Sequence, residues 1–308
     1  MSKRVLSQEA FNKASHFLLH STRAVERSAY NCHFEGAEGD KLLLELGNYQ
    51  NPDGGFGHGL EPDLRLPYSS PFTTSVAFRH LGHLDENKRR GKLSENGINY
   101  FEKTFCRDKE RWFAVPKKVN DYPHAPWWHY SGNGERTAAD NNWGNPSAEI
   151  TAYLLRYKDF VQEIDLTELV KTAVRKLNNK REFHSEHEIF CYLKLYYALP
   201  SKWAKKIEDK LYTAIQNLVC SNPDKWDNYV PQPLHFVDSP DSQRFGISES
   251  LIEENLEFWI EMLEQEGVLK PSWKWDQYEK EWERAKSEWT GILTLKALTT
   301  LDKFNRIT

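Results

Sequence analysis

Apolar residues recur every three or four positions over most of this 308-residue chain. In the segment 7–31, for example, Phe11, Ala14 and Leu18 fall on one side of a helix. No stretch alternates apolar and polar residues as a half-buried strand does, so we expect at most a short hairpin within residues 107–130. The pattern therefore predicts an all-α protein.

The same periodicity predicts further helices, separated by loops rich in glycine, proline and asparagine. Their expected ranges are 37–48, 72–84, 93–105, 147–159, 165–179, 186–199, 201–220, 248–266 and 279–303. We expect all 308 residues to form a single domain. Segments 70–81, 145–157 and 287–298, with 184–199 as a looser fourth, each place Ser or Thr ahead of an Ala/Leu-rich stripe. Such repeated patterns are typical of arrays of helix pairs. An irregular helical domain is the alternative to such an array.

The composition excludes several classes of protein. A net charge of -4 with mixed signs argues against nucleic-acid binding, which needs a basic face. No apolar run approaches the length of a membrane span, and the first twenty residues lack a signal-peptide core, so we expect a cytoplasmic protein without stable membrane insertion. The four cysteines are widely spaced, which favours reduced thiols over a zinc site or disulfides.

The tryptophan content is high, at eleven residues. Seven of them fall in predicted loops, beside Pro, Asn, Asp or Gly: Trp112, Trp127, Trp128, Trp143, Trp226, Trp273 and Trp275. Loop aromatics in this setting are typical of a ligand-facing surface, although core packing would explain many aromatic residues on helices.

One motif narrows the fold further. Residues 42–57 read LLLELGNYQNPDGGFG, an apolar helix that ends in Gln50 and a turn with two glycines. The amide of Gln50 can both donate and accept at helix ends, Pro52 and the glycines suit a tight turn, and Phe56 can pack back between neighbouring helices.

This motif resembles the glutamine-aromatic repeat of terpenoid cyclases and protein prenyltransferases. A degenerate second copy lies at 265–269, and the ending EWTGILTLKALTTL resembles the closing inner helix of that superfamily. The resemblance implies an (α/α) toroid or barrel of about five to six helical hairpins, with long loops at one end. The chain lacks the Asp-x-Asp-Asp acid motif, the Asp-Asp-x-x-Asp magnesium motif and a match to the zinc ligands of these families. No catalytic residue is therefore carried over from them.

The segment 55–67, here called the acidic loop, is the first candidate site. Its candidate side chains are His58, Glu61, Asp63 and Arg65. Two carboxylates beside an arginine and a histidine can split their pKa values into an acid and a base. In the alternative reading, Asp63 and Arg65 pair with each other and cap the helix that follows.

The segment 122–134, here called the aromatic loop, is the second candidate. It carries Trp127, Trp128 and His129, whose rings could stabilise a carbocation or stack on a sugar, or could simply pack an insertion. His124 and His129 lack a third ligand, so we predict no metal site. Trp143 precedes a helix that carries Glu149 in its first turn, where a carboxylate suits the helix dipole.

These residues define three hypotheses. The first is a terpenoid-cyclase-like enzyme that binds an apolar, isoprenoid-type substrate in an aromatic-lined toroid cavity. Its catalytic carboxylates would be Glu61, Asp63 and Glu149, and its substrate-binding residues His58, Arg65, Trp127, Trp128, His129 and Trp143. The second is a carbohydrate-active α/α-barrel hydrolase or lyase that uses the same carboxylates. The third is a non-catalytic binding or scaffold protein. The expected partner is thus a small molecule, apolar or carbohydrate, and no P-loop, Rossmann fingerprint or nucleophile elbow specifies a cofactor.

Overall fold

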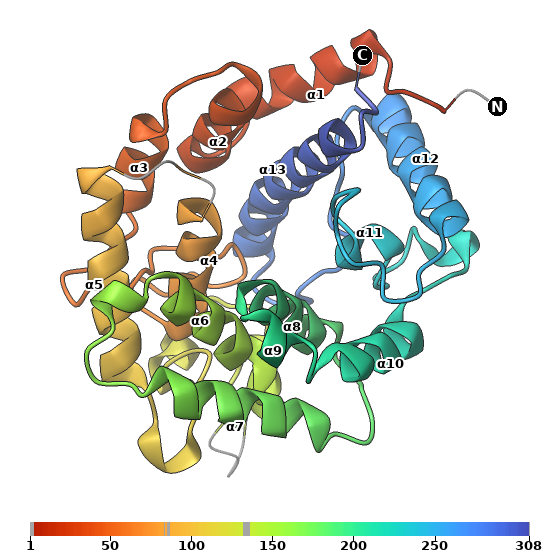
Figure 1. Ribbon diagram of the computed structural model, residues 1–308. Helices are drawn as coiled ribbons and strands as arrows, with labels where there is room; N and C mark the ends of the chain where they lie inside the picture. The colour runs from red at the N-terminus through yellow and green to blue at the C-terminus, as the bar shows by residue number, and fades with distance from the viewer. Residues whose placement is uncertain (1–2, 83, 85–86, 132–135, 308) are drawn as a thin grey trace. The chain divides into compact units, whose positions relative to one another are not determined.

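The computed structural model describes residues 3–82, 84, 87–131 and 136–307 (Figure 1). Over these ranges the secondary structure consists of α-helices, short 3-10 turns and isolated β-bridges, without a strand, which confirms the all-α prediction. None of the described helices combines the length and the apolar composition that crossing a bilayer requires.

The chain packs as two compact units, which we call the middle unit and the terminal unit. The middle unit is Leu43–Asn217, and the terminal unit is Met1–Leu42 with Leu218–Thr308. Helix α3 (Asp40–Gly47) leads from the first part of the terminal unit into the middle unit. The single domain expected from the sequence stays a prediction.

The middle unit contains a row of three neighbouring helices, α4, α6 and α8, which we call the helix row. Helix α6 packs against α8 on one side and α4 on the other, while α5 packs on α4 and α7 on α6 (Figure 1). Each of the first two row helices is thus followed by a helix that packs against it. The bounds are α4 (Pro71–Leu81), α5 (Lys88–Thr104), α6 (Gly144–Arg156), α7 (Leu166–Asn178), α8 (Glu186–Ala198), α9 (Ser201–Ala204) and α10 (Glu208–Leu218).

Small residues at the helix starts let the row helices approach closely. Ser70 caps α4 by accepting a hydrogen bond from the Thr73 N–H at 3.0 Å, and the Ser and Thr side chains of the first turns are buried. At the start of α6, a Cβ added to Gly144 would lie 2.6 Å from a ring atom of Tyr192 on α8. Only a glycine fits there without moving that ring.

The glutamine turn fastens two helices of the middle unit. The Gln50 amide donates to the carbonyl oxygens of Gly54 at 2.9 Å and of Leu93, in α5, at 3.1 Å. Gly54 has φ +93°, and a Cβ there would lie 2.3 Å from the Asn96 carbonyl oxygen. Phe56 is fully buried, and its N–H donates to the Thr74 hydroxyl of α4 at 3.0 Å. The motif therefore joins α5 to α4, as its residue types suggest.

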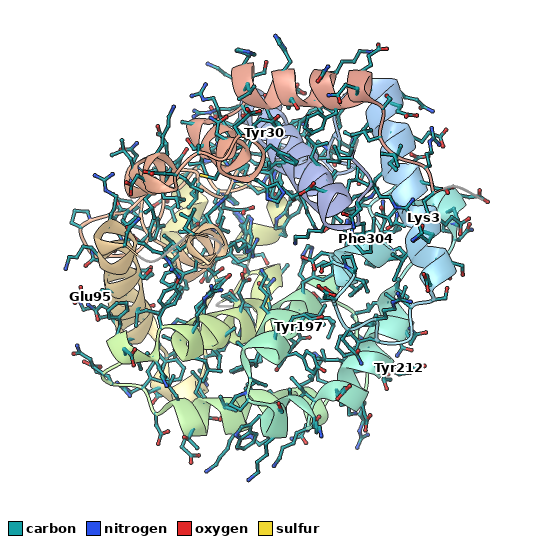
Figure 2. All side chains as sticks on the ribbon, turned by 45° about the horizontal axis from the view of Figure 1, so that its top comes forward. Lys3, Tyr30, Glu95, Tyr197, Tyr212 and Phe304 are labelled. Carbon is teal, nitrogen blue, oxygen red and sulfur yellow. The ribbon has the colours of Figure 1, made fainter. Side chains whose placement is uncertain are left out.

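The terminal unit brings the two ends of the chain together. Its helices are α1 (Gln8–His20), α2 (Ala24–Phe34), α11 (Pro233–Phe236), α12 (Glu249–Glu266) and α13 (Glu279–Lys303). The Leu6 N–H donates to the Arg306 carbonyl oxygen at 2.8 Å, and the Arg306 guanidinium binds Glu253 of α12. Lys3, labelled in Figure 2, also pairs with Glu253, at 2.9 Å. These contacts fix both chain ends to the same helix.

Two predicted helices are wrong in their extent. The segment 7–31 is not one helix, because the Thr22 hydroxyl donates back to the Leu18 carbonyl at 2.6 Å and Arg23 is extended with ψ 157°. The segment 201–220 likewise breaks between α9 and α10. Within 107–130 the chain forms 3-10 turns at Arg107–Lys109, Lys117–Asp121 and Pro126–Trp128.

Candidate functional site

Glu149 is the centre of a polar contact between all three row helices. Its side chain is fully buried in the first turns of α6. Arg79 of α4 donates to both carboxylate oxygens, from Nε at 2.9 Å and from Nη2 at 3.0 Å. Lys194 of α8 donates to Oε1 at 2.6 Å. A forked arginine contact and a short lysine contact to one carboxylate are strong charge-assisted hydrogen bonds.

Two further groups complete this contact. The Tyr153 hydroxyl, one helical turn after Glu149, donates to Oε1 at 2.7 Å, and the Cys191 thiol lies 3.6 Å from Oε2. Burial raises the pKa of both Tyr153 and Cys191, so both are neutral. We refer to this set as the charge cluster: Arg79, Glu149, Tyr153, Cys191 and Lys194.

The charge cluster keeps its carboxylate ionised. Burial alone would raise the pKa of Glu149, but the charges and hydrogen bonds of Arg79 and Lys194 outweigh burial and hold this pKa well below its usual range. The pKa of Lys194 is lowered by burial and by the Arg79 charge, which Glu149 offsets only in part. Two cations thus share one anion.

An aromatic pair adjoins the charge cluster. The Arg79 guanidinium lies 5.6 Å from the centre of the Phe72 ring, two turns earlier on the same face of α4. The Phe72 ring is in turn 4.5 Å from the Trp128 ring of the aromatic loop. Trp128 is 3% exposed, and its indole N–H has no acceptor among the described residues.

The acidic loop and the aromatic loop are paired through their backbones. The Ala125 N–H donates to the Asp63 carbonyl oxygen at 3.0 Å. The Arg65 N–H donates to the Pro123 carbonyl oxygen at the same distance. Asp63 and Glu61 are both buried. The loop that carries the two candidate acids is therefore fastened to the loop that carries Trp128.

The two histidines of the aromatic loop contact each other. His124 is fully buried, with Nδ1 2.6 Å from the Tyr122 carbonyl oxygen and Nε2 3.0 Å from Nδ1 of His129, whose ring stacks on it. Burial lowers the pKa of His124, so it is neutral near pH 7. In the described ranges no three His, Cys, Asp or Glu side chains gather as metal ligands would.

The remaining candidate residues differ in burial and in the partners that they contact. His58 is exposed, with Nε2 2.9 Å from the Asn51 side-chain oxygen. Arg65 and Trp127 are half-buried and His129 is exposed. Trp143 is buried, and its indole N–H donates to the Glu110 carbonyl oxygen at 2.8 Å. The last residues of the aromatic loop, 132–134, lie outside the described residues.

Most of the loop tryptophans belong to the core. Five of the seven are buried, and only two are half-buried, Trp127 and Trp273. A tryptophan in a loop is thus not by itself a sign of a ligand-facing surface in this chain. Exposed aromatics occur elsewhere, as at Tyr197 of α8 and Tyr212 of α10, both labelled in Figure 2.

Sequence reasoning missed five contributors to the site: Phe72, Arg79, Tyr153, Cys191 and Lys194. Arg79 stands near the end of its helix, where a basic residue is expected to favour the dipole and face water. Lys194 offered a signal, because it interrupts the apolar run IFCYLKLYYAL of α8. A lone lysine inside such a run needs a buried partner, and Glu149 is that partner.

Comparison of the chain with protein-family models, with curated proteins and with solved structures finds no match. The chain is therefore defined by its own fold and site. It is an all-helical protein whose middle unit holds a buried carboxylate between two basic side chains, beside a tilted Phe–Trp pair.

Proposed function

We propose that this chain is a terpenoid-cyclase-like enzyme with an (α/α) toroid fold, and that it acts on an apolar, isoprenoid-type substrate. The acid is a carboxyl group of the acidic loop, Asp63 or Glu61. Its proton adds to a substrate double bond, whose π electrons form the new C–H bond and leave a carbocation. The carboxylate left by the first step, or water, then takes a proton from a neighbouring carbon, whose C–H electrons form the new double bond, and the reaction ends without any change of oxidation state.

The observation that carries this proposal is the pairing of the two loops. Two buried carboxyl side chains, of Glu61 and Asp63, lie on a loop that is hydrogen-bonded to the loop of Trp128. The Trp128 ring packs on the Phe72 ring of α4. Aromatic faces stabilise a nearby cation by their quadrupole, and a buried acid is shielded from water that would capture the cation. The helix pairs of the middle unit and the fastened glutamine turn support the toroid.

The acid role goes to the acidic loop and not to Glu149. A general acid needs a pKa near the working pH, whereas the pKa of Glu149 is held far below it by Arg79 and Lys194. The same argument disfavours a glycosidase mechanism in which Glu149 is the second carboxylate, because both of its oxygens already accept from side chains of the row helices.

The test is proton-initiated turnover in heavy water. Squalene and geranylgeranyl phosphate are incubated separately with the full chain in D₂O, and products are analysed by mass spectrometry. We expect an isomeric product that carries one deuterium, because the acid exchanges its proton with the solvent. Asp63→Asn or Glu61→Gln should lower the rate at least about 100-fold, the usual contribution of a general acid.

Asp121→Asn is the matched control, since it removes an exposed carboxylate close in sequence to the aromatic loop. It should leave turnover unchanged. Absence of deuterated product from both substrates would refute the proposal. Equal turnover by the wild type and the double variant Glu61→Gln/Asp63→Asn would refute the assignment of the acid.

A further inference from the structure

The basic side chains of the charge cluster have more hydrogen-bonding capacity than Glu149 uses. Arg79 donates from Nε and Nη2, and within the described ranges its Nη1 donates to no acceptor. Lys194 makes one hydrogen bond from an ammonium group that has three donors. The two side chains are 38% and 37% exposed, so their free donors are accessible.

The charge of the cluster is also unbalanced. Arg79 and Lys194 carry two positive charges, Glu149 carries one negative charge, and the Tyr153 and Cys191 side chains are neutral. Over the described ranges, Glu149 is the one carboxylate within ion-pair distance of either cation. A surplus positive charge, partly shielded from water, is a binding site for an anion, because a fork of N–H donors matches carboxylate and phosphate oxygens.

The surroundings indicate what else the ligand contains. The Phe72 ring lies against the Arg79 guanidinium, and Trp128 lies against Phe72, so an apolar ring pair adjoins the basic side chains. The Trp128 indole N–H is an independent sign of a missing partner. It is buried and lacks an acceptor among the described residues, which is costly in the free protein.

We propose that Arg79 and Lys194 bind the oxyanion head group of an otherwise apolar ligand, with Glu149 as their fixed counter-ion and Phe72 and Trp128 against the apolar part. This inference deepens the proposed function, since it names the substrate as an amphiphile with a carboxylate or phosphate head. Glu149 holds the two cations in place and limits the affinity, because it competes with the ligand for their charge.

The experiment measures binding of octyl phosphate, octanoate and octanol to the full chain by titration calorimetry. We expect both anions to bind at least about tenfold more tightly than octanol, since one charge-assisted contact contributes about that much. The stronger of the two anions shows whether the head group is a phosphate or a carboxylate. Lys194→Met should reduce the affinity for the anions to that for octanol. Lys92→Met, which removes an exposed lysine with a single carboxylate partner, should change nothing.

Glu149→Gln separates this proposal from a purely structural role of the cluster. If the cations bind a ligand, removal of the competing carboxylate raises the affinity for octyl phosphate about tenfold while octanol binding is unchanged. Equal binding of octyl phosphate and octanol by the wild type would overturn the proposal, and so would weaker anion binding by a folded Glu149→Gln variant. Should Lys194→Met not fold, these two measurements still decide. Asp63→Asn should keep the anion preference, so loss of turnover without loss of binding distinguishes the acid from the anion site.

Discussion

Glu149 in the middle unit and Glu288 in the terminal unit are buried glutamates with opposite surroundings. Both lie on helices of the repeated Ser/Thr pattern, α6 and α13. Glu149 pairs with two cations, Arg79 and Lys194, that have no other carboxylate partner among the described residues. Glu288 shares the half-buried Arg23 with a second carboxylate, buried Glu26, which accepts from the arginine fork at 2.6 and 2.9 Å, while the ion-pair distance from Arg23 to Glu288 is 3.8 Å.

The difference in the surroundings of the two glutamates indicates which of the two clusters can bind a ligand. The Arg23 side chain is only 12% exposed and is already held by carboxylates, so its charge is used inside the protein. Arg79 and Lys194 are over a third exposed and exceed the charge of their partner. A buried glutamate paired with basic side chains is therefore common to both clusters, and of the two only the charge cluster has accessible cationic charge in excess of its carboxylate.

The turn after Gln50, in the middle unit, and the turn after Gln265, in the terminal unit, also differ in their side-chain contacts. Gln50 bonds across to α5, whereas the Gln265 side chain bonds, among the described residues, to Glu261 alone, on its own helix at 2.9 Å in an exposed position. The second turn keeps part of the arrangement through the backbone. Gly267 ends α12 with φ +74°, and the Leu269 N–H donates to the Thr294 hydroxyl of α13 at 3.0 Å. The degenerate copy thus preserves the backbone contact and has lost the side-chain clamp.

Replacement of the two glutamates gives the largest expected difference. Glu149→Leu should lower the free energy of unfolding by about 3–5 kcal/mol, because it leaves two partly buried cations without their anion. Glu288→Leu should cost about 1 kcal/mol or less, since Arg23 keeps Glu26 and Arg284, which is 69% exposed, remains in water. Urea unfolding of both variants measures the difference. Equal losses would show that surplus charge does not distinguish the clusters.

Alanine at the two turn glycines is the next comparison. Gly54→Ala should cost about 2–4 kcal/mol, since the backbone has φ +93° and the new Cβ would lie 2.3 Å from a backbone oxygen that cannot rotate away. Gly267→Ala should cost only about 1 kcal/mol, because its φ is +74° but the nearest atom, Lys13 Cβ, lies 3.4 Å away. Thermal unfolding followed by circular dichroism measures both. A smaller loss for Gly54→Ala than for Gly267→Ala would contradict the close approach of the turn to α5.

Acid stability tests the ionised state of Glu149. Its pKa is depressed in the folded protein, so its contribution is fully present above the unfolded value of about 4.3 and is lost as the pH falls towards the folded pKa. Below about pH 4.3 the stability gap between the wild type and Glu149→Gln should narrow by up to about 1.4 kcal/mol per pH unit. Urea unfolding from about pH 6 to pH 3 gives the two curves. Parallel curves would mean that Glu149 titrates alike in both states.

The sequence predicts the helices and the turn because those depend on local periodicity and on single residues. Gln50, Gly54 and Phe56 act within a few residues of each other, whereas the motif does not identify their partners Thr74 and Leu93 on α4 and α5. The break after His20 is not predictable from the sequence, since a threonine that bonds back to its helix, as Thr22 does, looks like any helical threonine.

The charge cluster depends on contacts between residues that are far apart in the chain. Arg79 and Lys194 lie 115 positions apart, and periodicity alone gives no sign that both face Glu149. The carboxylate was singled out because it occupies the first turn of its helix, yet its partners were not. The pairing of the acidic and aromatic loops was equally invisible, because it uses backbone groups, which every sequence supplies.

The smallest expected effect comes from the glutamine side chains themselves. Gln50→Ala removes hydrogen bonds to two carbonyl oxygens and should lower the free energy of unfolding by about 1–2 kcal/mol. Gln265→Ala should change it by no more than about 0.5 kcal/mol, because the partner of Gln265 among the described residues is an exposed side chain. The loss at Gln50 should also be local, since the amide bonds the Leu93 carbonyl on α5. Native-state hydrogen exchange should therefore show faster exchange in the first half of α5 for Gln50→Ala and unchanged exchange in α12 for Gln265→Ala. Matching losses at the two positions would mean that the clamp lies in the backbone contacts to Thr74 and Thr294, which the two turns share, and not in the glutamine that differs between them.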